Sequence, residues 1–341
     1  ALSMQNILVV KLSAIGDVIH ALPVSYAIKE TFPDAHLTWV VEPPAYDLLT
    51  MNPYVDEIII FHKKEFKSIG GFLKNYGPLK HQIQQRSYDA VLDLQGLFKS
   101  AAIARLAKAP VKLGMCNMRE LSDRISRPVI GPHANGHIVE RYLDVARALG
   151  CRVDQVVFPL EVPEREADLT RRIFSQEGAN MGNPYVVFAV GANWPNKRWP
   201  TEYFAELSDW LYSKRLIPVI VGGGAVDTQR AAEICAAAEI PPINLVGRTN
   251  FRQLTYVLQN AQLTIGGDTG PVHLSAGVGT KTIMVMGPTD ANRNGPYGQL
   301  ENAIEVSHSC KYCWNRACPK GLDCLADITV GQVRAKVEEL I

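Results

Sequence analysis

The chain reads NILVVKLSAIGDVIHALPVSYAIKET from Asn6 to Thr31, and this stretch decides its fold class. Its first part, Asn6–Leu12, is a short run rich in β-branched side chains, which predicts a buried strand. Apolar residues at helical spacing follow from Gly16 to Thr31, so a helix comes directly after the strand. A buried strand that leads into a helix is typical of a parallel sheet, because parallel strands need a crossover connection.

The same alternation continues along the chain and restarts once, near residue 160. Apolar runs predict further strands at residues 36–41, 55–61, 88–94, 111–115, 185–190, 216–221, 243–246, 262–265 and 281–286. Helical patterns separate them, and we expect the helix over residues 66–86 to be interrupted at Gly70–Gly71 and Gly77–Pro78. We therefore predict an α/β protein with two doubly wound parallel-sheet domains, residues 4–160 and 161–341, and a ligand cleft between them. The last helix could pack back on the first domain, and one large α/β domain is the alternative.

Composition excludes several classes of protein. Hydrophobic residues make up 47% of the 341 residues and charged residues 20%, as in an ordinary globular protein. The net charge of +1 gives no reason to expect nucleic acid as a partner. No run approaches the roughly 18 apolar residues that span a bilayer, and no secretion signal follows Met4. We expect a protein of a reducing, cytoplasmic compartment.

Residues 266–273, GGDTGPVH, form the strongest candidate for a ligand loop. Two glycines end a predicted strand, Asp268 or Thr269 can cap the helix that follows, and Pro271 suits its first turn. The free amides at Thr269 and Gly270, with the Thr269 hydroxyl, would bind an anion such as a diphosphate. The alternative is plain helix capping, with His273 as a core histidine.

Basic residues lie in a second loop, WPNKRWP at residues 194–200, which follows the predicted strand over 185–190. Lys197 and Arg198 stand between two tryptophans and two prolines, so the loop is rigid and cationic. A cation at this place could neutralise a leaving phosphate. The alternative is a pair of solvated surface charges with the tryptophans packed on the domain.

Two further loops carry weaker signals. Asp17 follows the first strand and is either a carboxylate at the mouth of the cleft or a first-turn residue that stabilises the helix dipole. The glycines at 222–224 permit either a close approach of phosphate or a tight turn, and without G-x-G-x-x-G they do not identify a dinucleotide site.

Four of the seven cysteines lie within 15 residues: Cys310, Cys313, Cys318 and Cys324. Four thiolates can hold zinc or an iron–sulfur cluster, although the spacing is not the usual double C-x2-C. A metal site, reduced structural thiols and disulfides all remain open.

Taken together, five motifs resemble the lipopolysaccharide heptosyltransferases of glycosyltransferase family 9, most closely the type I enzymes. In chain order they are residues 11–23 (KLSAIGDVIHALP), 89–100 (DAVLDLQGLFKS), 197–200 (KRWP), 267–270 (GDTG) and 287–290 (GPTD). The resemblance covers nearly the whole chain, and the set is more specific than any single motif.

The resemblance implies a GT-B fold, with two Rossmann-like domains facing a central cleft, and an inverting, metal-independent transfer. The donor would be ADP-heptose, which supplies L-glycero-D-manno-heptose, and the acceptor a Kdo sugar on lipid A. The enzyme would act in inner-core biosynthesis, peripherally bound to the inner face of the cytoplasmic membrane. The four-cysteine segment occurs in some members but not in the best-known type I enzymes. A structural zinc or iron site is one interpretation of this segment.

The resemblance also assigns roles to residues. Asp17 would be the general base, and the donor would be bound by Lys197, Asp268, Thr269, Gly270 and His273. The acceptor would be bound by Arg119, with Lys63 and Lys64 as looser matches. The alternatives are a family 9 transferase for another acceptor (a heptose or a protein hydroxyl), a non-catalytic nucleotide-sugar-binding protein, and an oxidoreductase using NAD, which the missing G-x-G-x-x-G disfavours.

Overall fold

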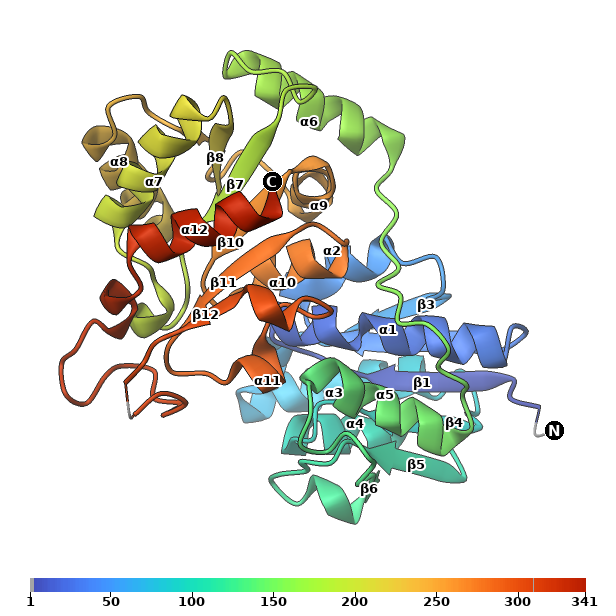
Figure 1. The fold of residues 1–341 in the computed structure, drawn as a ribbon. Coiled ribbons are helices and arrows are strands. Elements are labelled where there is room, and N and C mark those ends of the chain that lie inside the picture. Colours follow the sequence, from blue (N-terminus) through green and yellow to red (C-terminus); the bar gives the residue numbers. More distant parts are fainter. Residues whose placement is uncertain (1–2, 309) are drawn as a thin grey trace. The chain divides into compact units, whose positions relative to one another are not determined.

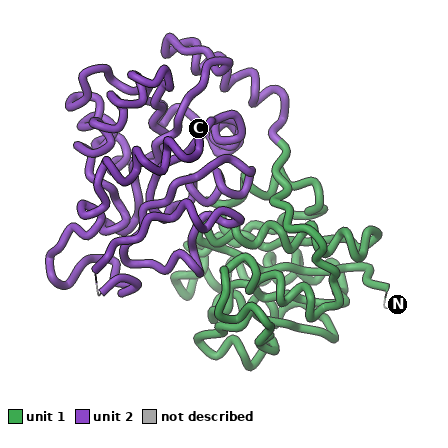
Figure 2. Tube along the Cα trace, in the orientation of Figure 1, with its two compact units in different colours: residues 1–161 green, residues 162–341 purple. Residues whose placement is uncertain are grey.

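A computed structural model describes residues 3–308 and 310–341. The chain divides into two compact units, one up to Glu161 and one from Val162 to Ile341, coloured separately in Figure 2. Each unit holds one parallel six-stranded sheet. No helix in the described ranges combines the length and the apolar character needed to cross a bilayer.

The sheet of the first unit has the strand order β3-β2-β1-β4-β5-β6, with β1 at its centre (Figure 1). Its strands are β1 (Asn6–Val10), β2 (His36–Val41), β3 (Glu57–Ile60), β4 (Ala90–Asp93), β5 (Val111–Gly114) and β6 (Arg127–Pro128). Its helices are α1 (Ile15–Thr31), α2 (Tyr46–Thr50), α3 (Ile69–Ile83), α4 (Phe98–Leu106) and α5 (Ile138–Leu149), and its 3-10 turns are η1 (Pro43–Ala45), η2 (Lys63–Phe66) and η3 (Ser122–Arg124). The apolar strands are buried because helices such as α1 and α5 cover the sheet.

The second unit repeats this plan with the strand order β12-β11-β10-β7-β8-β9. Its strands are β7 (Tyr185–Ala189), β8 (Ile217–Val221), β9 (Ile243–Asn244), β10 (Leu263–Gly266), β11 (Thr282–Met286) and β12 (Ala303–Glu305). Its helices are α6 (Glu164–Gln176), α7 (Thr201–Ser213), α8 (Ala225–Ala237), α9 (Phe251–Asn260), α10 (Gly270–Gly277), α11 (Ala291–Asn294) and α12 (Val330–Leu340). Three 3-10 turns complete it: η4 (Pro195–Lys197), η5 (Leu300–Asn302) and η6 (Cys324–Asp327).

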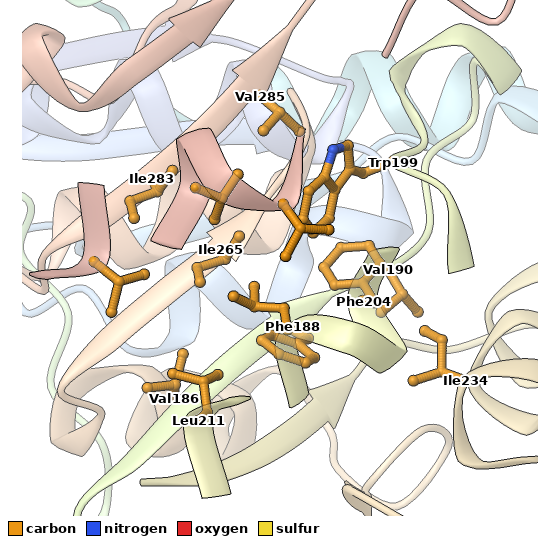
Figure 3. Packing of buried hydrophobic residues seen from close by; sticks show 14 of the residues in the cluster. Val186, Phe188, Val190, Trp199, Phe204, Leu211, Ile234, Ile265, Ile283 and Val285 are labelled. Carbon is orange, nitrogen blue, oxygen red and sulfur yellow. The ribbon is translucent and has the colours of Figure 1, made fainter. Parts of the chain in front are cut away.

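An aromatic cluster lies in the core of the second unit, beside the candidate loops. Figure 3 shows Trp199 and Phe204 together with the strand residue Phe188. The Trp199 and Phe204 rings meet edge to face, with centroids 4.9 Å apart. This packing fixes Trp199, which follows Lys197 and Arg198 in the 194–200 loop.

The predicted α/β class with two parallel sheets is confirmed, and one local expectation differs from the structure. Helix α3 runs without interruption through Gly70–Gly71 and Gly77–Pro78. Pro78 removes one helical hydrogen bond, but it is exposed, and water can satisfy the freed carbonyl. The last helix, α12, contributes its buried valines to the core of the second unit.

Candidate functional site

Asp17 lies in the first turn of α1 and is half-buried. Its Oδ2 accepts a hydrogen bond from the backbone amide of Ala14 at 3.2 Å, so the local capping contact expected of a first-turn carboxylate is present. Its other oxygen has no hydrogen-bond partner within the described ranges. One lone-pair-bearing oxygen is therefore available to a ligand hydroxyl.

The loop after β4 connects the Asp17 loop to the segment that contains Arg119, another candidate residue. Gln95 Oε1 accepts hydrogen bonds from the amides of Leu12 and Ser13, at 3.1 and 3.2 Å. The next residue, Gly96, accepts at its carbonyl oxygen the amide of Arg119 at 2.8 Å. Gly96 has φ +69, and a Cβ there would lie 2.9 Å from the carbonyl oxygen of Asn117, so glycine is required. Gln95 was not among the predicted site residues, although it stands inside the DLQG motif.

A buried carboxylate holds this connecting loop in place. Asp93, at the end of β4, accepts the amides of Gln95 and Gly96 at 3.0 and 2.9 Å and the Ser100 hydroxyl at 3.0 Å. Burial raises the pKa of Asp93, and these hydrogen bonds offset only part of that effect. The loop is thus built as a rigid bridge between the Asp17 and Arg119 segments.

Lys63 and Lys64 lie apart from that bridge. They are exposed in η2, after β3, and neither makes an ion pair among the described residues. Arg119 is also exposed. All of these residues follow carboxyl ends of parallel strands, which is the edge where this class of sheet binds its ligands.

Asp268 is the centre of the cluster in the second unit. It is 7% exposed and follows β10. Its Oδ1 lies 2.5 Å from His273 Nε2. Its Oδ2 accepts the Thr289 hydroxyl at 2.7 Å and the Asn294 side-chain amide at 3.2 Å, and forms an ion pair with Lys197 Nζ at 3.2 Å.

The surroundings of Asp268 keep it ionised. Burial alone would raise the pKa of this carboxyl, but the hydrogen bond from His273 and the charges of His273 and Lys197 outweigh it. The net effect places the pKa of Asp268 well below its ordinary range. The carboxylate thus orients the lysine and the histidine, and it does not cap α10.

Thr269 and Gly270 begin helix α10. Thr269 is the N-cap residue, yet its hydroxyl makes no capping hydrogen bond. The Oγ1 atom is buried and has no partner among the described residues. A buried polar atom is costly to leave unpaired, so this hydroxyl fits an oxygen of a bound ligand. The amides of the helix start lie beside it and favour an anion.

Lys197 is held from several sides and is not a solvated surface charge. Its side chain is 14% exposed, and Nζ lies 4.1 Å from the centroid of the Trp194 ring. A Cβ on Gly267 would collide with the carbonyl oxygen of Lys197, so only glycine allows the two loops to approach this closely. Trp199 anchors the end of the loop by donating to the carbonyl oxygen of Ile328 at 2.9 Å.

Other predicted features turn out to be structural. The amide of Gly223 donates to Asp227 Oδ2 at 2.9 Å, and Gly224, the N-cap residue of α8, has φ +89, so the 222–224 run forms a tight turn. Arg198 donates to the carbonyl oxygen of Ala192 at 2.8 Å and so serves the fold of its own loop.

The cysteine segment gives no support to the zinc or iron interpretation. All seven cysteines are free thiols, and the described residues contain no group of three or more side chains arranged to hold a metal. Burial, followed by the nearby Cys318, Asp323 and Cys313, raises the pKa of Cys324. The segment is instead attached by backbone: Trp314 donates to the carbonyl oxygen of Pro288 at 2.8 Å.

The family match and the similar proteins of known name agree on one family. Residues 77–322 match glycosyltransferase family 9 (heptosyltransferase). Lipopolysaccharide heptosyltransferase 1 of Pseudomonas aeruginosa is 30% identical over 325 residues, which cover 92% of this chain and 87% of that protein.

Two solved structures show the same fold. The family 9 glycosyl transferase of Veillonella parvula superposes with a TM-score of 0.86 at 24% identity, covering 100% of this chain and 98% of that one. The heptosyltransferase WaaC of E. coli, solved with ADP-2-deoxy-2-fluoro heptose, gives a TM-score of 0.73 at 26% identity, covering 98% and 99%. The expected GT-B class of fold, with two parallel sheets, is thereby confirmed. With the match over most of its length, the chain belongs to glycosyltransferase family 9, the heptosyltransferases, and is an enzyme of that class.

Proposed function

We propose that this enzyme transfers L-glycero-D-manno-heptose from ADP-heptose to a Kdo sugar on lipid A, with inversion, in lipopolysaccharide inner-core biosynthesis. The observation that carries the proposal is the Asp268 cluster, which presents a lysine, a histidine and an unpaired threonine hydroxyl beside a helix start. The relatives support the substrate class, because one is named a lipopolysaccharide heptosyltransferase and another was solved with an ADP-heptose analogue.

In this proposal the second unit binds the diphosphate of the donor. Lys197 contacts a phosphate oxygen, the Thr269 hydroxyl and the Gly270 amide donate to another, and Asp268 with His273 hold the lysine and the loop. Negative charge grows on the ADP leaving group as the glycosidic bond breaks, and a preorganised cation with helix amides stabilises it. A charge-assisted contact of this kind is worth about 1.5–3 kcal/mol.

Asp17 is the general base in this proposal. Its unpaired oxygen accepts the proton of the attacking acceptor hydroxyl, while the Ala14 amide fixes the orientation of the carboxylate. Gln95 acts as a positioning residue, since it holds the backbone at Leu12 and Ser13 ahead of the base.

Arg119 takes the anionic groups of the acceptor, and Lys63 and Lys64 add further positive charge. A Kdo sugar carries a carboxylate, so a cationic set at this sheet edge suits it. We further propose that the enzyme works at the cytoplasmic face of the inner membrane, where a lipid-linked acceptor is available, and that the transfer needs no metal.

The test is ADP release on incubation with ADP-heptose and a panel of acceptors: Kdo-lipid A, a heptosylated core and a protein with free hydroxyls. We expect release only with Kdo-lipid A, at an unchanged rate in EDTA, and a product of inverted anomeric configuration. Release with another acceptor alone would reassign the acceptor, and binding of ADP-heptose without turnover would identify a non-catalytic binder.

A further inference from the structure

Helix α3 is attached to its unit near its two ends. Ile83 is buried and Leu79 is partly buried against the core of the first unit. Toward its start the helix packs on η2, where the Phe66 and Phe72 rings meet edge to face with centroids 6.0 Å apart. The remaining length of the helix faces solvent.

An exposed stripe of α3 is apolar. Ile69 is 82% exposed and Leu73 is 75% exposed, the highest values among the large hydrophobic side chains of the described residues. Phe72 and Tyr76 are also exposed, and their rings stack on each other with centroids 5.2 Å apart. The spacing of these four residues places them on one side of the helix. A contiguous apolar stripe of this kind marks an interaction surface.

The segment that carries this stripe is rich in lysine. Residues 62–83 contain five lysines and a single acidic residue, Glu65. The lysines are Lys63, Lys64, Lys67, Lys74 and Lys80, all exposed. None of them forms an ion pair within residues 3–308 and 310–341. Their charge is therefore available to an anionic partner.

An apolar helix stripe in a lysine-rich segment matches the interface of a bilayer that contains anionic lipid. The apolar side chains enter the boundary between headgroups and acyl chains, and lysine stems extend so that the ammonium groups reach the phosphates. Lysine density adds attraction through the negative surface potential of such a membrane. A protein partner of ordinary charge would not need this excess of lysine.

We propose that η2 and α3, residues 63–83, form the surface by which this protein docks on an anionic lipid bilayer. Binding to lipid depends only on this surface. Its use in reaching a lipid-linked acceptor rests on the proposed function.

The experiment is co-sedimentation with lipid vesicles at low and high salt. The vesicles contain phosphatidylcholine alone or with about 30% phosphatidylglycerol, which supplies the negative surface potential. We expect wild type to bind only the anionic vesicles and to dissociate as salt rises. Each lysine near the surface should contribute about fivefold, so Lys74→Gln/Lys80→Gln should weaken binding roughly 25-fold.

A variant of the apolar pair and a matched control distinguish lipid binding through this surface from nonspecific hydrophobic binding. Ile69→Ser/Leu73→Ser should weaken binding at least about tenfold, because two inserted side chains are lost. Ile130→Ser is the control, since Ile130 is 72% exposed in the same unit but lies outside residues 63–83. It should bind as wild type does. Circular dichroism should show an unchanged fold in all variants, because only exposed side chains change.

Three results would overturn the proposal: no binding of wild type to anionic vesicles, equal binding to neutral vesicles, or wild-type binding by both double variants. A dimer that only the Ile69→Ser/Leu73→Ser change dissociates, without lipid binding, would assign the stripe to a second copy of the chain instead. ADP release with an acceptor freed of its acyl chains is measured in parallel. If ADP release is absent while vesicle binding is intact, the result contradicts the proposed function and leaves the docking surface supported.

Discussion

Replacing Asp268 with asparagine should destabilise the second unit and disable the donor site together. The change keeps the shape of the side chain but removes the charge that faces Lys197 and His273. Both partners are then left in a buried place without a counter-ion. Removing one partner of a buried ion pair typically costs about 3–5 kcal/mol, and Asp268 is buried enough for that range to apply.

The assay is urea and thermal unfolding followed by tryptophan fluorescence. Four of the five tryptophans lie in the second unit, namely Trp194, Trp199, Trp210 and Trp314, so the signal reports mainly on that unit. A loss of about 3–5 kcal/mol in a unit of this size lowers the melting temperature by about 6–20 °C. The matched control is Asp290→Asn, since Asp290 caps α11 by accepting the Asn292 amide and asparagine caps equally well.

The pH dependence follows from the depressed pKa of Asp268. A carboxyl whose folded pKa is lowered contributes stability fully above the unfolded pKa, about 3.9, and loses it as pH falls toward the folded pKa. The gap between wild type and Asp268→Asn should therefore shrink as the pH falls below about 4. Unfolding of Asp268→Asn within about 0.5 kcal/mol of wild type at pH 7 would refute the reasoning, because surface changes have effects of that size.

Three further changes test other parts of the site. Lys197→Ala should weaken ADP-heptose binding by about 1.5–3 kcal/mol in calorimetry and slow transfer in parallel, and unchanged affinity with normal turnover would remove Lys197 from the donor site. Gln95→Leu leaves the Leu12 and Ser13 amides without their acceptor, so kcat should fall while donor affinity, which depends on the other unit, stays unchanged; a variant with normal kcat would show that this bond does not position the base. The cysteine segment should hold less than about a tenth of an equivalent of zinc or iron by elemental analysis, with four titrating thiols, and a full equivalent would contradict the arrangement described here.

The order of elements could be predicted because each buried strand is a short apolar run with a helical pattern after it. The same patterns place the loops containing Lys197 and Asp268 at one sheet edge, since β7 and β10 are neighbours. They do not determine which side chains pair there. Asn294 reaches Asp268 from the short helix α11, 26 residues along the chain, and no local pattern indicates that bond.

The helix α3 shows the opposite difficulty. Its glycines and Pro78 favour interruption locally, yet the exposed position of the helix tolerates them. The spacing of the cysteines likewise gives only the separation of the thiols along the chain. The position of this segment in space depends on the backbone hydrogen bonds of Tyr312 and Trp314 to the 287–288 loop. Local sequence patterns therefore do not predict which distant segments bury these polar groups.

The role of Asp17 as general base is tested most directly by the turnover of Asp17→Asn with ADP-heptose and Kdo-lipid A, measured beside its donor affinity and melting temperature. Asparagine preserves the shape of the side chain but cannot take the acceptor proton. If Asp17 is the base, kcat should fall by about 10²–10⁴, with donor affinity within about threefold and an unchanged melting temperature. Near-wild-type turnover would contradict it and leave Asp17 with only its contact to the Ala14 amide.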